Sequence, residues 1–231
     1  MAFAIGGGVA FAASLAVAGY AYVMWWGEPA GVWSILAGAA PAAANVLLFT
    51  LFALHHSVLA RTGAKARVEA LVPAGLERSV YVWTASLLFA AVCLAWRPVP
   101  GVLWSAPAPW REVLAALQIG GVLLTVRAAT RIDPLDLAGI RQALGVADRP
   151  SPELISDGLY RLVRHPIYLA WLLMVWPAPT MTGTRLAFAA VSTAYLAVAI
   201  PFEERELVRS FGSHYIAYRR RVRWRLLPFV F

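Results

Sequence analysis

The chain has 231 residues, of which 61% are hydrophobic and only 14% are charged. Soluble domains carry about a quarter charged residues, so this composition excludes an ordinary soluble domain and indicates an integral membrane protein. The formal net charge of +8 rests on 19 arginines and one lysine. Because these residues flank apolar stretches instead of lining one polar face, we predict no nucleic-acid binding.

Six apolar stretches are long enough, or nearly so, to cross a membrane as helices, which takes roughly 20 residues. They comprise residues 1–27, 29–54, 79–96, 113–126, 167–181 and 186–202. The first has no charge and lacks the basic region of a secretory signal, so we predict that it is retained as a span. The fourth is short, but Arg111 and Arg127 can snorkel from its ends and the helix can continue to Thr130.

The positions of the basic residues predict an orientation. Residues 61–78, 127–164 and 205–225 hold seventeen of the twenty, whereas the alternate connections hold only Arg97, Arg111 and Arg185. Cytoplasmic loops carry the excess of arginine and lysine. We therefore predict that both termini lie in the cytoplasm.

Two further segments complete the predicted architecture. Residues 132–156 are rich in turn residues and should form a cytoplasmic loop with room for one short helix. In residues 203–223, Leu207, Phe211, Tyr215 and Tyr218 recur at spacings of three and four, which predicts an amphipathic helix that lies along the membrane surface or over a site. On this helix His214 occupies a solvated position.

We predict an all-α integral membrane protein with about six transmembrane helices and a cytoplasmic amphipathic C-terminal helix. All 231 residues form one domain, in which residues 1–131 supply four supporting spans and residues 132–156 the loop. Residues 157–231 supply a helical hairpin, broken at 176–179 and turned at 182–184, and the C-terminal helix. The single cysteine, Cys93, lies in an apolar run and gives neither a disulfide nor a cysteine-based metal site.

Two polar clusters bracket the hairpin, and Arg185 is the only charged residue between His165 and Glu203. His165 and Tyr168 share a helix face, and Pro166 suits the first turn of a helix. Arg164 and His165 would then lie at a helix N-terminus, which favours an anionic ligand group. The alternative is that the pair caps the helix and contacts lipid phosphate.

The adjacent carboxylates Glu203 and Glu204 follow the last span and need partners at that depth. Those partners are either arginines, such as Arg164 and Arg205, or a ligand with positive charge or hydroxyl groups. Both an interfacial ion-pair network and a ligand site therefore remain open.

The sequence His55-His56-Ser57 closes the second stretch on the same predicted side. Two histidines can supply a base near neutral pH, although a hydrogen-bonded interfacial histidine is the commoner outcome. A metal site is not predicted, because no second histidine or carboxylate follows at i+3 or i+4. The motifs of P-loop, Rossmann and serine-hydrolase enzymes are absent from the sequence.

The last 75 residues or so resemble a known superfamily. They carry Gly158-Leu159-Tyr160, Val163-Arg164-His165-Pro166-x-Tyr168, Glu203-Glu204-x-x-Leu207, Phe211-Gly212-x-x-Tyr215-x-x-Tyr218 and Pro228. This pattern is similar to the C-terminal signature of the isoprenylcysteine carboxyl methyltransferase and phospholipid methyltransferase superfamily. Further segments extend the resemblance to bacterial methanethiol S-methyltransferases: residues 54–61, 77–82, 96–98, 135–142 and 179–182.

The resemblance implies an S-adenosylmethionine-dependent enzyme of the bacterial inner membrane that methylates a small thiol, most simply methanethiol to dimethyl sulfide. It implies a cytoplasm-facing donor pocket closed by the C-terminal helix. The implied donor-binding residues are Tyr160, Arg164, His165, Tyr168, Glu204, Tyr215 and Tyr218. The predicted catalytic residues are His55 or His56 as the base, with Glu203 as the next candidate.

Three alternatives remain open at this point. A phospholipid or isoprenylcysteine-type acceptor is one, although Val198 stands where prenylcysteine enzymes place an arginine for the substrate carboxylate. A non-enzymatic membrane component of nitrogen-oxide metabolism is the second, since such proteins share the first-half motifs. A steroid-reductase-like enzyme is the third, but the sequence has no extra basic cluster for a 2′-phosphate.

Overall fold

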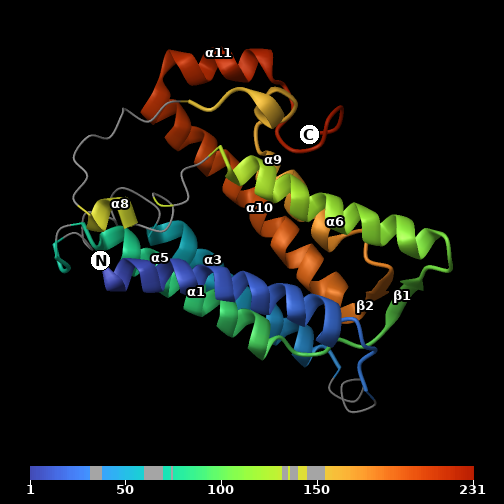
Figure 1. Ribbon diagram of the computed structural model, residues 1–231. Coiled ribbons are helices and arrows are strands. Elements are labelled where there is room, and N and C mark those ends of the chain that lie inside the picture. Colours follow the sequence, from blue (N-terminus) through green and yellow to red (C-terminus); the bar gives the residue numbers. More distant parts are fainter. Residues whose placement is uncertain (32–37, 60–69, 74, 132–134, 136–139, 145–153) are drawn as a thin grey trace. The chain divides into compact units, whose positions relative to one another are not determined.

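A computed structural model of the protein (Figure 1) describes residues 1–31, 38–59, 70–73, 75–131, 135, 140–144 and 154–231. These residues are mostly helical and divide into two compact units, which are described separately. The first unit comprises Met1–Ser105, Asp133–Asp148 and Thr180–Val191. The second comprises Ala106–Ile132, Arg149–Pro179 and Ser192–Phe231.

The first unit is built on three long helices: α1 (Ala2–Tyr20), extended by a π-helical turn η1 (Ala21–Trp25), α3 (Ala40–Leu59) and α5 (Glu77–Ala95). It also contains the short α8 (Ile140–Ala143), the strands β1 (Val102–Ser105) and β2 (Thr180–Thr182), and the start of α10 (Gly183–Phe211). α1 lies against α5 (Figure 1). Trp83 of α5 fits against Gly7 and donates its indole N–H to the Phe3 carbonyl at 2.9 Å.

An aromatic cluster forms the core of the first unit. The ring centroid of Phe188 lies 4.7 Å from that of Trp26, 5.3 Å from that of Trp96 and 6.0 Å from that of Phe49. All four side chains are buried. Trp26 and Trp96 directly follow η1 and α5, and the other two rings lie on α3 and α10. The cluster therefore joins four separate segments and supplies a large apolar contact area.

Arg185 is buried in the same unit. Its guanidinium lies over the Tyr22 ring, 5.1 Å from the centroid, and donates to backbone carbonyls. Its Nε and Nη2 donate to the Tyr22 carbonyl at 3.0 and 2.8 Å, and Nη2 also reaches the Val23 carbonyl at 3.1 Å. Its Nη1 donates to the Thr180 carbonyl at 2.7 Å. A helix C-terminus leaves carbonyls without partners and carries partial negative charge. Arg185 therefore caps the C-terminal end of the first span. The sequence placed it only as a charge in a connection and did not predict this contact.

The strand pair is the part of the first unit that the all-α prediction missed. β1 and β2 run antiparallel, with Val102 opposite Thr182 and Ser105 opposite Thr180. Gly183 follows directly and donates its N–H to the Gly101 carbonyl at 2.7 Å. A Cβ at Gly183 would lie 2.2 Å from the Pro100 carbonyl oxygen, so only glycine fits this close approach of two backbones.

The second unit contains α6 (Trp110–Ala129), the 3-10 turn η2 (Gly158–Arg161), α9 (Pro166–Val175), the rest of α10 and α11 (Ser213–Arg221). α6 and α9 lie side by side (Figure 1). Gln118 donates to the Met174 carbonyl at 2.7 Å. The indoles of Trp171 and Trp176 donate to Ser192 and Thr193 of α10 at 3.0 and 2.9 Å. These hydrogen bonds satisfy polar groups between apolar helices.

Four helices of the described chain are long and apolar enough to cross a membrane: Ala2–Trp25, Glu77–Ala95, Trp110–Ala129 and Gly183–Phe211. They correspond to four of the six predicted spans. The predicted span 29–54 overlaps α3, which begins at Ala40, and residues 32–37 lie outside the described chain. The predicted span 167–181 overlaps α9, which has only ten residues and ends before Pro177.

The hairpin and the C-terminal helix differ from their predicted boundaries. α10 starts at the predicted turn and continues past Phe202 to Phe211, with Pro201 inside it. The predicted amphipathic helix 203–223 is therefore divided between the end of α10 and α11. The division falls at Gly212, whose φ of 53° suits glycine. Of the predicted loop 132–156, α8 is the expected short helix and much of the remainder lies outside the described residues.

The contact between α6 and α9 gives a matched test of the packing. Gly121 is buried there, and a Cβ on it would meet the Ala170 carbonyl oxygen at 2.8 Å, whereas a Cβ on Gly120 would meet nothing within 4 Å. We expect Gly121→Ala to lower the free energy of unfolding by about 1–3 kcal/mol through overpacking. Gly120→Ala should raise it by about 0.5–1 kcal/mol. Chemical denaturation in detergent measures both, and equal effects would contradict the packing.

Candidate active site

The predicted polar residues of the C-terminal half meet in the second unit, around the N-terminus of α9. His165 is the N-cap of that helix and Pro166 is its first residue, as predicted. The backbone amides of Arg164 and His165 donate to the carbonyls of Trp224 and Arg225, both at 2.9 Å. The segment that follows α11 therefore runs beside the start of α9.

Arg164 holds three parts of the chain together. Its Nε donates to Glu204 Oε1 at 2.6 Å, and its Nη1 donates to the carbonyls of Val222 and Arg223, both at 2.8 Å. The side chains of Arg164 and Glu204 are 7% and 3% exposed. Arg225 Nε lies 3.4 Å from the second oxygen of Glu204. Glu204 therefore takes part in an ion-pair network with arginines, which is one of the two interpretations that the sequence left open.

His165 lies between the two carboxylates. Its ring stacks on that of Tyr168, with centroids 5.4 Å apart and planes 5° apart. Its Nδ1 is 3.5 Å from Glu203 Oε2, and Tyr168 donates its hydroxyl to that same oxygen at 2.8 Å. Its buried Nε2 is 3.5 Å from Glu204 Oε1 but makes no hydrogen bond within the described chain. Glu203 itself is 43% exposed, so this carboxylate is available to a ligand.

The tyrosines of α11 line the other side of this cluster. Tyr218 donates its hydroxyl to the Tyr160 carbonyl at 2.7 Å. Tyr215 is 1% exposed, and its hydroxyl has no hydrogen-bond partner among the described residues. Burial raises the pKa of Tyr218 to about 12. Burial also raises the pKa of Tyr215 and, helped by the charge of Glu203, that of Tyr160. All three phenols are thus neutral donors near physiological pH.

The chemistry of this set suits a molecule with positive groups and with further polar groups that form hydrogen bonds. Glu203 is an exposed carboxylate that accepts the hydroxyl of Tyr168, and carboxylates and tyrosine rings both attract cations. Tyr215 Oη is buried without a hydrogen-bond partner in the described chain. His165 Nε2 is also buried, and its nearest partner there is Glu204 Oε1 at 3.5 Å, beyond good hydrogen-bond distance. Such atoms mark places where a ligand or water completes the hydrogen bonding.

His55 and His56 lie elsewhere, near the end of α3 in the first unit. His56 Nδ1 is 3.0 Å from the hydroxyl of Tyr81 on α5. The guanidinium of Arg78 lies over the Tyr81 ring, 5.4 Å from its centroid. His55 Nδ1 is buried without a hydrogen-bond partner in the described chain. The structure therefore fixes His56 through Tyr81, and the role of either histidine as a base stays a prediction.

Sequence reasoning missed Arg225 and the carbonyls of residues 222–225, although they hold the start of α9. Backbone carbonyls carry no side-chain signal, and Arg225 looked like one more member of a basic tail. Tyr81 belongs to the segment 77–82, which supports the resemblance, but the sequence does not mark it as the partner of His56. Only the position of Pro166 hinted at the helix start that the tail meets.

The sequence was compared with known proteins. Residues 115–214 match the family model for phospholipid methyltransferases, an interval that includes Arg164, His165, Glu203 and Glu204. No solved structure matches the chain.

Curated relatives share more of the chain. Methanethiol S-methyltransferase 2 of Bradyrhizobium diazoefficiens is 41% identical over 183 residues, which are 77% of this chain and 70% of the relative. The methanethiol S-methyltransferase of Mycobacterium tuberculosis is 39% identical over 188 residues, 80% of this chain and 77% of the relative. That of a Pseudomonas species is 36% identical over 182 residues, 77% and 70% respectively.

The ion pair around Arg164 predicts a non-additive mutant cycle. Arg164→Met leaves Glu204 buried with less compensation, so we expect the free energy of unfolding to fall by about 3–5 kcal/mol. Replacing both partners, as in Arg164→Met with Glu204→Leu, should cost less than the sum of the single changes. Arg161→Met, at an exposed position nearby, is the control and should change stability little. Additive single and double values would contradict the coupling.

The buried phenols predict an alkaline limit to stability. Since the folded pKa of Tyr218 is raised above the unfolded value near 10, the unfolded state ionises first. The contribution of Tyr218 to the free energy of unfolding is therefore fully present below about pH 10. It is lost as the pH rises toward the folded pKa of about 12. Tyr218→Phe should lose a hydrogen bond worth about 1 kcal/mol at neutral pH but decline less between pH 10 and 12. A parallel decline in both proteins would exclude this role for Tyr218.

Proposed function

Because the chain belongs to the family of methanethiol S-methyltransferases, we propose that it transfers a methyl group from S-adenosylmethionine to a small thiol. Methanethiol is the simplest acceptor, and dimethyl sulfide is then the product. The identity to curated relatives over about four fifths of the chain carries the choice of acceptor. The structural observation that supports a donor site is the exposed carboxylate of Glu203 beside His165 and Tyr168.

The donor supplies a methyl group on a positively charged sulfur. On this proposal Glu203 and the Tyr168 ring meet the positive groups of the donor. Tyr215 Oη and His165 Nε2, which makes only the 3.5 Å contact with Glu204, meet its hydroxyl or carboxylate groups. Arg164, Glu204 and Tyr218, together with the Tyr160 carbonyl, hold α9, α10 and α11 around that position. In this assignment Arg164 and Glu204 position the helices. The resemblance instead implied that both residues bind the donor directly.

The reaction is a displacement in which the acceptor sulfur attacks the methyl carbon. A carbon–sulfur bond to the acceptor forms as the bond to the donor sulfur breaks, and the donor leaves neutral at sulfur. The thiolate is the reactive form of a thiol, so a base must take the thiol proton. His55 or His56 is the proposed base, and Glu203 is the next candidate. Alignment of the two reactants supplies much of the rate enhancement.

The membrane arrangement is part of the proposal. Six spans, with α3 and the short α9 region added to the four long apolar helices, would form a single inner-membrane domain. Both termini, the loop 132–156 and the donor site would face the cytoplasm, as the excess of basic residues in those segments favours. A cytoplasmic site would give direct access to S-adenosylmethionine.

The acceptor is tested with purified protein in detergent and methyl-labelled S-adenosylmethionine. Methanethiol, a prenylated cysteine and phosphatidylethanolamine are offered in parallel, and the labelled products are identified. We expect labelled dimethyl sulfide from methanethiol alone. Labelled phospholipid would favour the activity named by the family model, and no transfer to any acceptor would contradict the enzyme proposal.

The roles of the carboxylates and histidines predict distinct kinetic effects. Glu203→Gln should lower kcat/KM by about 10²-fold or more, because it removes the charge that faces the donor. Glu206→Gln, one turn further along α10 and paired with Arg209 at the surface, is the matched control and should change it less than about twofold.

For the base, we expect alanine at His55 or His56 to lower kcat by about 10²–10⁴-fold and to change its pH profile. Raising the assay pH should restore part of the rate, since a thiolate formed in solution needs no base. If the double substitution leaves turnover and the pH profile unchanged, neither histidine is the base and Glu203 takes its place.

A further inference from the structure

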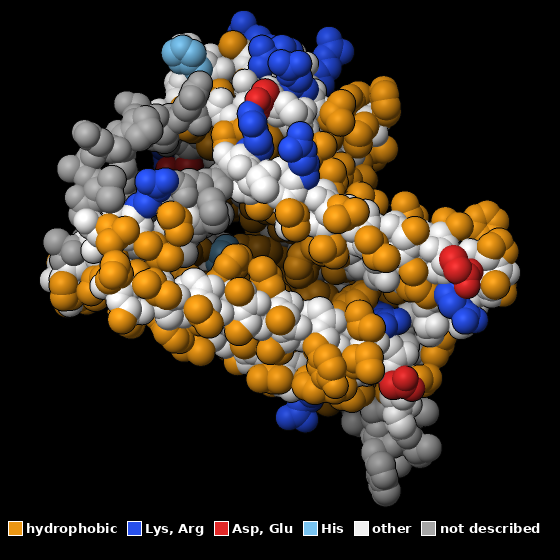
Figure 2. Space-filling view, in the orientation of Figure 1, with side chains coloured by type: hydrophobic (Ala, Val, Ile, Leu, Met, Phe, Trp, Pro, Cys, Tyr) orange, Lys and Arg blue, Asp and Glu red, His pale blue; other side chains and the backbone are white. Residues whose placement is uncertain are grey.

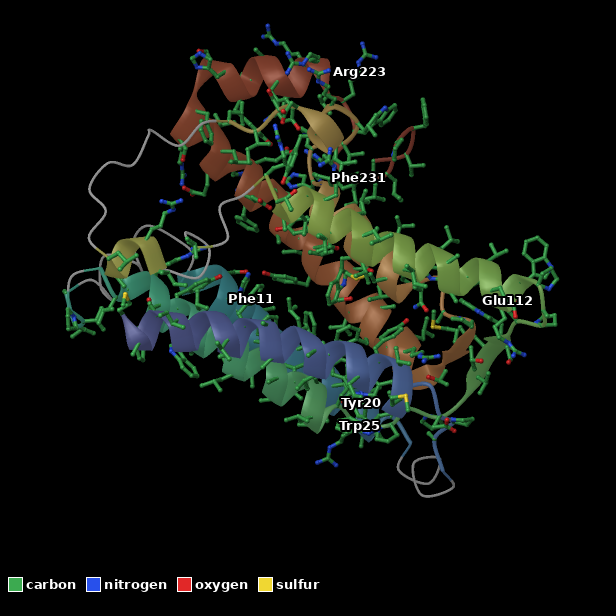
Figure 3. All side chains as sticks on the ribbon, viewed as in Figure 1. Phe11, Tyr20, Trp25, Glu112, Arg223 and Phe231 are labelled. Carbon is green, nitrogen blue, oxygen red and sulfur yellow. The ribbon has the colours of Figure 1, made fainter. Side chains whose placement is uncertain are left out.

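Helix α11 has two chemically different faces. Its buried face consists of Tyr215, Tyr218 and the following Val222. This face packs against Leu154, Tyr160, Leu207, Val208 and Phe211. The other face is exposed and basic, with Arg219, Arg220 and Arg221 on the helix and Arg223 just beyond it. Figure 2 shows these cations gathered over α11, and Figure 3 labels Arg223.

No carboxylate of the described chain pairs with the guanidinium groups of these four arginines. Arg225 is different, because it reaches Glu204. Four unpaired guanidinium groups within five residues repel one another. They therefore favour a partner that supplies several negative charges over a surface.

Exposed apolar side chains lie directly after the arginines. Phe229 is 86% exposed and Val230 75% exposed. The segment that carries them is ordered, because the amides of Leu226 and Leu227 donate to the Phe231 carbonyl at 2.8 and 3.1 Å. Trp224 contacts the Phe229 ring, with centroids 5.5 Å apart. This turn holds large apolar side chains outward next to positive charge.

The connection to α10 places this region near a membrane surface. α10 has 29 residues, about 44 Å of helix, which matches the thickness of a bilayer with its headgroups. Only Gly212 separates α10 from α11. The arginines therefore lie within about two to three turns of the point where the chain leaves the lipid.

We propose that the C-terminal surface, formed by Arg219, Arg220, Arg221, Arg223, Phe229 and Val230, binds anionic phospholipid headgroups of the membrane that the chain spans. Guanidinium groups bind phosphate through paired hydrogen bonds. Basic residues at a membrane surface are attracted by anionic lipid, by about fivefold in partitioning for each residue. The apolar tip enters the boundary between headgroups and acyl chains, as in interfacial helices that combine both kinds of side chain.

The surface is coupled to the candidate active site through α11 itself. Tyr215 and Tyr218 lie on the opposite face of the same short helix, and Arg164 binds the carbonyls of Val222 and Arg223. Lipid contact on the arginines therefore stabilises the position of the two tyrosines. This consequence rests on the proposed function, whereas lipid binding does not.

The experiment places a spin label on α11 in the full chain. His214 is exposed on α11, and Cys93 is buried at 1% exposure, so His214→Cys provides the reactive thiol and the unsubstituted chain controls for background labelling. The labelled protein is placed in nanodiscs of phosphatidylcholine, with or without phosphatidylglycerol. Collision of the label with a water-soluble relaxation agent is then measured.

We expect phosphatidylglycerol to reduce these collisions at least several-fold. The change should disappear when Arg219, Arg220, Arg221 and Arg223 are replaced by glutamine, and persist in Arg111→Gln, a control that removes charge elsewhere. High salt should abolish it without any substitution, because salt screens the attraction. Equal collision rates in the two lipid compositions would overturn the proposal. So would a phosphatidylglycerol-dependent reduction in collision rate that persists both after the four substitutions and in high salt.

A soluble phosphate compound separates two sources of the same chemistry. Glycerol phosphate added to phosphatidylcholine nanodiscs should leave the label exposed, and a shift equal to that caused by phosphatidylglycerol would overturn lipid binding. The KM for S-adenosylmethionine, measured in the same nanodiscs, tests the coupling. We expect a lower KM with phosphatidylglycerol, and an unchanged KM would remove the coupling. The collision measurement requires neither S-adenosylmethionine nor a thiol acceptor, so its result is independent of the proposed activity.

Discussion

The buried ion pair between Arg164 and Glu204 is the interaction on which the candidate site depends. Removing two charges from water is costly, and a buried pair persists only when its remaining hydrogen bonds are satisfied. Here the carbonyls of Val222 and Arg223 accept from Arg164, and Arg225 lies near the second oxygen of Glu204. The pair thereby joins the start of α9, α10 and the segment after α11. It adds to the packing against Tyr160 and Leu207 that holds the tyrosines of α11 in place.

Glu203 and Glu204 show how neighbouring residues of one helix come to differ in role. Successive side chains on a helix point about 100° apart, so Glu204 turns inward to the arginines while Glu203 stays 43% exposed beside His165 and Tyr168. The inner carboxylate is paired with arginines, whereas the outer one is open to a ligand. A similar division holds on α11, where tyrosines face the site and arginines face outward.

The long apolar helices could be predicted from sequence, because hydropathy over about 20 residues is a local property. The start of α9 followed from Pro166, and the break before Pro177 from the prolines themselves.

Contacts between distant segments could not be predicted. Arg185 looked like a loop charge, yet it caps the first span by binding carbonyls of Tyr22 and Val23. Other features likewise depend on backbone groups that the sequence does not mark. They are the pairing of β1 with β2, the division of the helix at Gly212 and the binding of Arg164 by the carbonyls of Val222 and Arg223. The residue set of the proposed donor site follows from the resemblance, whereas the different surroundings of Glu203 and Glu204 are visible only in the geometry.

In the proposed function, Glu203, His165, Tyr168 and Tyr215 receive the methyl donor, while Arg164 and Glu204 hold the surrounding segments in position. An experimental structure with S-adenosylhomocysteine bound, determined in lipid nanodiscs, tests it most directly. We expect the ligand beside Glu203 and Tyr168, with new hydrogen bonds from His165 Nε2 or Tyr215 Oη and with the Arg164–Glu204 pair intact. A ligand bound away from the N-terminus of α9, or an Arg164 that leaves Glu204 to bind the ligand carboxylate, would contradict it.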